Sequence, residues 1–129
     1  MLDAELAEHV TVHDLADRGV SSVRMKDAFL NYALSDELKA SLKDVCRRRI
    51  DGGIRGFVVD LAAVTVMDSC GLSVLISIKK LVEGEGGRVA LSGLSPMIER
   101  LFGITKLDRV FEIHADEAAA VAALSPPAR

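Results

Sequence analysis

Aromatic residues are scarce in this sequence, which has one Tyr, four Phe and no Trp among its 129 residues. Proteins that bind single-stranded nucleic acids stack bases on exposed aromatic rings, and general nucleic-acid binding needs a basic surface. Here 16 Lys and Arg face 19 Asp and Glu, for a formal net charge of −3. The composition therefore predicts an aliphatic core and argues against a nucleic-acid partner.

Cysteine and long apolar runs are also scarce. Cys46 and Cys70 are too few for a disulfide framework or a zinc knuckle. No stretch approaches the roughly 18 uninterrupted apolar residues of a membrane span. The acidic start of the chain lacks the basic and apolar regions of a secretory signal. We therefore expect a cytoplasmic protein without direct membrane insertion.

The sequence shows no pattern of metal ligands or of a phosphate-binding loop. His9 and His13 lie in a segment that alternates like a strand, which would separate them by about 13 Å. His114 belongs to a different predicted element, so we expect exposed surface histidines and no metal. The glycines at 84–87 follow a predicted helix and precede a strand, the reverse of a phosphate-binding loop. No cofactor is expected.

The chain does contain an alternation of predicted strands and helices. Alternating apolar residues predict strands at 10–15 and 20–25, joined by a turn at 17–19 as an antiparallel edge pair. Residues 26–34 look irregular, and Ser35 is the expected N-cap of the next helix. Further strands are expected at 56–61, 88–91 and 110–113, and helices at 36–51, 69–82, 96–103 and 117–123.

This order of elements predicts an α/β fold, because strand–helix–strand units of this length imply right-handed crossovers. We expect a central mixed β-sheet of about five strands, with four to five helices packed mainly on one face. The length suits a single domain. We assign residues 1–9 to an N-terminal extension, 10–123 to the domain and 124–129 to a disordered C-terminal tail.

Ser69 is the sharpest candidate for a functional residue. It follows a predicted buried strand and turn, and it precedes Gly71 and an amphipathic helix. One interpretation is structural, with Ser69 or Asp68 as the helix N-cap. The other is a phosphoacceptor: a helix N-terminus tolerates the added charge of about −1.5 to −2, whereas a docked partner would meet a hydrated dianion. The residues alone leave both interpretations open.

Cys70 adjoins Ser69 at the predicted helix start, a position that lowers the pKa of a thiol. A redox-sensitive thiol and a small residue that fits the turn are both open interpretations. Neither side chain has a nearby histidine in the sequence to act as general base. We therefore expect no catalytic nucleophile, and no enzyme.

Two stretches in the middle of the chain resemble the signature of the STAS domain. They are the strand F-V-V-D-L at 57–61 and V-T-V-M-D-S-C-G-L-S-V-L at 64–75. The similarity continues through 86–96 and 101–113 and covers about residues 55–123. The family comprises anti-sigma factor antagonists, stressosome subunits and the cytoplasmic domains of sulphate transporters, so the resemblance implies a STAS domain over 10–123.

The resemblance also implies a role for Ser69. In anti-sigma factor antagonists, the serine directly after the signature aspartate is phosphorylated by a cognate serine kinase. The unphosphorylated form binds that serine-protein kinase, a kinase-type ATPase of the anti-sigma factor class. Phosphorylation ends binding, and a PP2C-type phosphatase restores it. We accordingly expect partner contacts at Asp68, Ser69, Cys70, Gly71 and Leu72.

The chain departs from the family pattern in two places. Cys70 stands where the family usually has a second Ser or Thr, and K-D-A-F-L-N at 26–31 replaces the usual Gly-x-Leu-Asp segment. Partners in this family contact that segment too, so the partner of this chain need not be a sigma-factor regulator. The alternative function is a constitutive structural STAS subunit of a stressosome-like or membrane-transporter complex.

Overall fold

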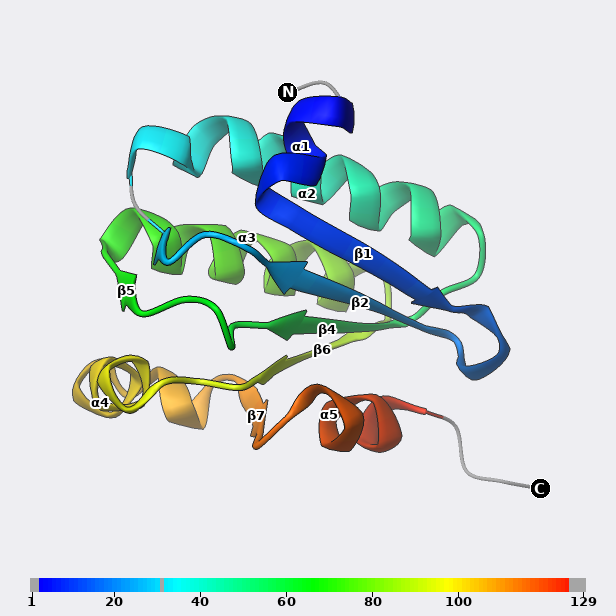
Figure 1. Cartoon of the computed structure of the whole chain (residues 1–129). Coiled ribbons are helices and arrows are strands. Elements are labelled where there is room, and N and C mark those ends of the chain that lie inside the picture. Colours follow the sequence, from blue (N-terminus) through cyan, green and yellow to red (C-terminus); the bar gives the residue numbers. More distant parts are fainter. Residues whose placement is uncertain (1–2, 31, 126–129) are drawn as a thin grey trace.

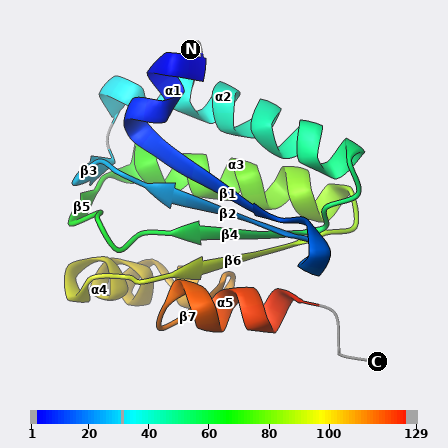
Figure 2. The same ribbon diagram turned by 45° about the vertical axis from the view of Figure 1, so that its right-hand side comes forward.

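The structure is a computed structural model that describes residues 3–30 and 32–125. A central sheet separates helices on its two sides, and Figures 1 and 2 show the layers from two directions. The predicted α/β fold with a mixed five-stranded sheet is confirmed.

The main sheet has the strand order β1-β2-β4-β6-β7. At one edge, β1 (Val10–Leu15) pairs antiparallel with β2 (Val20–Met25), as the alternation predicts. β4 (Gly56–Asp60), β6 (Arg88–Ser92) and β7 (Glu112–His114) continue the sheet in parallel. The carboxyl ends of these parallel strands therefore share one edge, the usual place for function in an open α/β sheet.

The turn between β1 and β2 is a single 3₁₀ turn, η1 (Ala16–Arg18), followed by Gly19. Gly19 has a φ of 67°, a left-handed conformation that favours glycine. Its carbonyl oxygen accepts hydrogen bonds from the backbone N–H groups of Arg55 at 3.2 Å and Gly56 at 3.1 Å. The turn thus also positions the start of β4.

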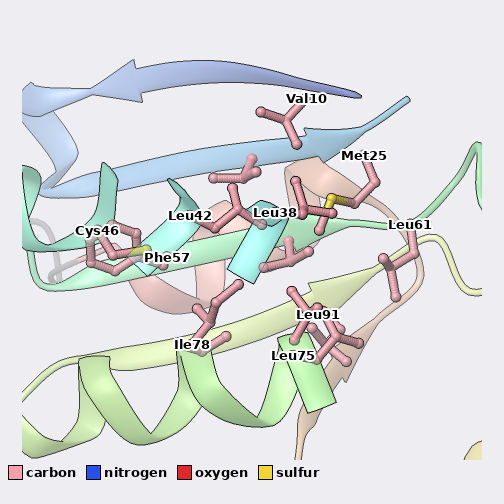
Figure 3. Packing of buried hydrophobic residues seen from close by; sticks show 14 of the residues in the cluster. Val10, Met25, Leu38, Leu42, Cys46, Phe57, Leu61, Leu75, Ile78 and Leu91 are labelled. Carbon is pink, nitrogen blue, oxygen red and sulfur yellow. The ribbon is translucent and has the colours of Figure 1, made fainter. Parts of the chain in front are cut away.

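The large aliphatic core lies between the sheet and two long helices that pack against each other, α2 (Tyr32–Asp51) and α3 (Ser69–Gly84). α1 (Asp3–His9) and α4 (Pro96–Thr105) add side chains to the same core. Figure 3 shows buried members of this cluster from both helices and from the sheet, among them Leu38, Leu42, Phe57, Leu75, Ile78 and Leu91.

The opposite face of the sheet is covered by α5 (Glu117–Leu124). Asp116 caps this helix by accepting a hydrogen bond from the N–H of Ala119 at 2.8 Å. A smaller apolar cluster lies between α5 and the sheet, made of Val20, Val58, Ala90, Ala120 and Val121. The described helices therefore pack mainly on one face, as predicted, with α5 on the other.

The structure corrects the prediction around residues 26–35. α2 begins at Tyr32, so Ser35 lies inside the helix and the predicted N-cap is wrong. Ala33 and Leu34 are strong helix formers, which allows the helix to begin upstream of the serine. Within the segment predicted to be irregular, β3 (Phe29–Leu30) is a two-residue strand, too short for an alternating pattern to reveal it.

Other element bounds also differ from those expected. α4 continues past Gly103, the predicted end, to Thr105. Lys106 is its C-cap, with a φ of 60°. The last strand begins at Glu112, two residues later than predicted. At the C-terminus, the hydroxyl of Ser125 donates a hydrogen bond to the carbonyl of Val121 at 2.7 Å. Residues 126–129 of the predicted tail lie outside the described residues.

Candidate functional site

The candidate site lies at the carboxyl edge of the sheet, where α3 begins (Figure 1). β4 ends at Asp60, and the chain then passes through residues 61–65 to the two-residue strand β5 (Val66–Met67). Asp68 and α3 follow directly. The connection is short and close to the sheet, so the strand ends determine where the first turn of α3 lies.

Asp68, and not Ser69, is the N-cap of α3. Its backbone is extended, with φ −98° and ψ −176°, and its Oδ1 accepts a hydrogen bond from the N–H of Gly71 at 3.0 Å. Its carbonyl oxygen accepts from the N–H of Leu72 at 3.1 Å. Ser69 is the first helical residue and is exposed. Capping therefore does not use the hydroxyl of Ser69, which is an exposed residue.

The five predicted site residues occupy this one turn but differ in burial. Ser69 is exposed, while Asp68 and Cys70 are half-buried. Gly71 and Leu72 are buried on the side of α3 that packs on the core. Ser69 is thus the most exposed of the five residues.

The segment that departs from the family pattern lies beside the approach to Ser69. β3 pairs in parallel with β5, with Phe29 opposite Val66. The carbonyl oxygen of Ala28 accepts hydrogen bonds from Thr65 N–H at 2.8 Å, Thr65 Oγ1 at 3.1 Å and Val66 N–H at 3.1 Å. The backbone of residues 28–30 therefore lies directly against the segment that leads into Ser69, a contact that local sequence patterns do not reveal.

Asp60 supports the connection that leads to Ser69, a role that was not predicted from the sequence. Its side chain is buried, accepting hydrogen bonds from Arg24 Nε at 3.1 Å and from the N–H of Ala62 at 3.0 Å. The N–H of Leu61, the residue directly after Asp60, donates a hydrogen bond to the carbonyl oxygen of Ser92 at 2.8 Å. The only signal in the sequence is an acidic residue inside an otherwise apolar strand.

The two cysteines differ in environment. Cys46 lies in α2 within the core, and burial raises the pKa of its thiol to about 12. Cys70 is half-buried in the first turn of α3. Of these two thiols, Cys70 is therefore the one that reagents from solution can reach in the folded protein.

The histidines are not all exposed, which corrects the prediction. His13 is exposed, but His9 and His114 are half-buried beside carboxylates. His9 Nδ1 lies 2.7 Å from Asp27 Oδ2, and His114 Nε2 lies 3.3 Å from Glu112 Oε1. Within the part of the chain that the structure describes, no group of three or more His, Cys, Asp and Glu side chains is arranged to hold a metal ion.

Among the helices within residues 3–30 and 32–125, none combines the length and the apolar character needed to cross a bilayer.

Comparison with known proteins finds one family and several similar proteins. The model of the STAS domain family matches residues 19–120. The anti-sigma F factor antagonist of Paenibacillus polymyxa is 29% identical over 107 residues, which are 83% of this chain and 88% of that protein. The chain is thus similar in sequence to anti-sigma factor antagonists.

Two solved structures share the fold. An anti-sigma-factor antagonist (STAS) domain protein from Planctomyces limnophilus is 19% identical with a TM-score of 0.74, covering 90% of this chain and 97% of that one. The Bacillus cell fate determinant SpoIIAA in its phosphorylated form is 17% identical with a TM-score of 0.62, covering 85% of this chain and 95% of that one.

Proposed function

The chain belongs to the STAS domain family, and we propose that it is a regulator whose binding to a partner protein is switched by phosphorylation of Ser69. The unphosphorylated form binds a serine-protein kinase of the anti-sigma factor class. That kinase transfers phosphate from ATP to Ser69, which releases the complex, and a PP2C-type phosphatase restores binding. The chain itself is a non-enzymatic substrate of this cycle, which operates in the cytoplasm.

The observation that carries this proposal is the division of roles between Asp68 and Ser69. Asp68 accepts the capping hydrogen bond from Gly71, so the exposed Ser69 hydroxyl is available without disrupting the helix. In the transfer step, Ser69 Oγ forms a bond to the γ-phosphorus of ATP, and the bond to the ADP leaving group breaks. The hydroxyl proton passes to a general base that the kinase supplies.

The expected effect of the phosphate is electrostatic. Its charge of about −1.5 to −2 changes the net charge from −3 to about −5. The N-terminus of α3 favours a negative charge, so the domain tolerates the modification. A partner docked over the same turn would have to desolvate the dianion next to the Asp68 carboxylate, which is costly without a matching cation. The fold therefore survives phosphorylation while the complex does not.

Two relatives support the proposal. The Paenibacillus polymyxa relative is named as an anti-sigma F factor antagonist. SpoIIAA, which shares the fold, has been solved in a phosphorylated form. These findings make a serine kinase of the anti-sigma factor class the first partner to test.

The test is phosphorylation by each purified kinase of this class encoded in the same genome, with ATP, followed by intact-mass and phosphosite analysis. One phosphate per chain is expected on Ser69, and none on Ser69→Ala. Ser73→Ala is the matched control, because Ser73 lies one turn later on α3 and donates to the carbonyl of Cys70 at 3.0 Å. A phosphate elsewhere, or none from any kinase, would contradict the proposal.

A second measurement separates the alternative function. If the chain forms a large assembly by light scattering, or copurifies with a membrane transporter regardless of the state of Ser69, it is a constitutive structural subunit. A switched regulator instead gains and loses its partner with the phosphate.

A further inference from the structure

Three exposed apolar side chains belong to two elements that contact each other, β5 and α4, and β5 leads into α3. Four large apolar residues are exposed among those that the structure describes: Val66, Met97, Ile104 and Val110. Val66 belongs to β5, which leads directly into Asp68, while Met97 and Ile104 belong to α4, which contacts β5. Figures 1 and 2 both show α4 and β5 at the same end of the molecule.

α4 carries two apolar faces. Ile98 and Phe102 are 1% and 0% exposed and belong to the core. Met97 and Ile104 are seven residues apart, so they lie on one side of the helix, and they are 61% and 73% exposed. Folding therefore uses the first pair and leaves the second pair in water. Apolar side chains that cluster in this way mark interaction sites more often than isolated ones do.

The charges beside this stripe are more basic than the protein as a whole. The exposed charged residues of α4 and of the turn that follows it are three cations and two acids, whereas the full chain has a net charge of −3. They are Glu99, Arg100, Lys106, Asp108 and Arg109. These five residues, called the rim here, have a net charge of +1, which complements an apolar patch with acidic side chains at its edge.

We propose that Val66, Met97 and Ile104 form a second docking surface, the α4 surface, which binds an apolar, acid-rimmed patch on the same protein partner that covers the Ser69 turn. This inference rests on the proposed function, because it takes the Ser69 turn as the other half of the interface. The α4 surface supplies apolar anchors that phosphorylation does not touch, and the Ser69 turn supplies the part that phosphorylation disrupts.

A second copy of the chain fits this surface less well. A ten-residue helix is about 15 Å long and offers much less than the roughly 800 Å² per partner of a standard stable interface. In a two-fold pair, the basic rims would also face each other. A lipid surface is disfavoured because the rim has a net charge of only +1, where membrane binding uses several cations.

The test uses the full chain in the organism that encodes it, with a photo-crosslinking amino acid at position 66, 97 or 104. Position 110 is the matched control, because Val110 is 53% exposed but lines a groove beside Lys79 and Glu83 on the C-terminal half of α3. Each chain is made with Ser69→Ala and with Ser69→Glu. The crosslinked products are identified by mass spectrometry.

The inference predicts one and the same protein crosslinked from positions 66, 97 and 104 in the Ser69→Ala chains, and not from 110. It is overturned if 97 and 104 capture nothing, a second copy of the chain or lipid. If only position 66 crosslinks, and only with Ser69→Ala, the switch stands and the α4 surface fails. If all three positions crosslink the same protein equally in both backgrounds, the α4 surface stands and the switch fails.

Binding to the captured protein, purified, then measures the contribution of the stripe. Ile104→Glu should weaken binding at least about tenfold, since it removes an apolar anchor and sets an acid against an acidic rim. Ile104→Lys should weaken it less, and Val110→Glu by no more than about twofold. Equal binding by Ile104→Glu and the native chain, both folded by circular dichroism, would overturn the inference.

Discussion

Replacing Asp68 by alanine removes the side-chain cap of α3, and it tests which residue of the candidate site has the structural role. The lost interaction is the 3.0 Å hydrogen bond from the N–H of Gly71 to Asp68 Oδ1. Removing an N-cap costs about 1 kcal/mol in free energy of unfolding, within a range of roughly 0.5–2. For a chain of this length, that loss lowers Tm by about 3–6 °C.

Two further variants make the prediction specific. Asp68→Asn should leave the free energy of unfolding within about 0.5 kcal/mol of the native chain, because asparagine caps as well as aspartate. Ser69→Ala should also stay within about 0.5 kcal/mol, because an exposed first-turn side chain outside the cap contributes little.

The assay is urea unfolding followed by circular dichroism, with the midpoint and the slope fitted for each variant. The reasoning is refuted if Ser69→Ala loses as much stability as Asp68→Ala, because Ser69 would then be the cap. It is also refuted if Asp68→Ala is as stable as the native chain. Either result would remove the structural reason for treating the Ser69 hydroxyl as available to a kinase.

The remaining predictions concern backbone, pH and thiol chemistry. Gly93→Ala should lower the free energy of unfolding in urea by more than about 1 kcal/mol, since the φ of Gly93 is 69° and a Cβ there would lie 2.8 Å from a carboxylate oxygen of Asp60. The control is Gly103→Ala, at a helical position with open space, which should raise the free energy of unfolding by about 0.5–1 kcal/mol. Burial raises the pKa of Asp14, but hydrogen bonds from a serine of β2 and an arginine of α2 outweigh this and hold it below its ordinary value of 3.8. The stabilisation from the ionised form is therefore present above pH 3.8 and lost as the pH falls through the lowered pKa. The difference in free energy of unfolding between the native chain and Asp14→Asn should shrink on acidification, and a difference that stays constant with pH would contradict this prediction. At pH 8, a thiol reagent should label Cys70 in the folded protein and Cys46 only after unfolding, because burial raises the pKa of Cys46 to about 12; mass spectrometry of the labelled peptides distinguishes the two.

The parts of the fold that follow local patterns could be predicted from the sequence. The edge pair β1–β2, the strand β4 and the predicted starts of α4 at residue 96 and of α5 at residue 117 all agree with the structure. In each case, residues adjacent in sequence carry the information, as side-chain alternation or as a capping residue at a helix start.

The short strands β3 and β5 could not be predicted, because two residues carry no periodicity and each strand exists only through pairing with the other. The start of α2 at Tyr32, upstream of Ser35, could not be predicted for a different reason. A serine followed by two acidic residues fits the first turn inside a helix as well as it fits an N-cap, and only the backbone decides between them.

For the candidate site, the sequence indicated the turn but not the roles within it. Asp68 and Ser69 are both good N-caps, and the extended backbone of Asp68 is what gives it the capping bond. The sequence alone does not assign Met97 and Ile104 to the buried or to the exposed side of the predicted helix. Only the packing of Ile98 and Phe102 into the core shows that α4 turns the other pair outward.

The most direct test of the proposed switch is the affinity of the purified kinase for the chain with and without phosphate on Ser69, measured by calorimetry at one salt concentration. We predict that the phosphorylated chain binds at least about tenfold more weakly, because its dianion must be desolvated at the interface. Treatment with a PP2C-type phosphatase should restore the original affinity. Equal affinity of the two forms would contradict the account.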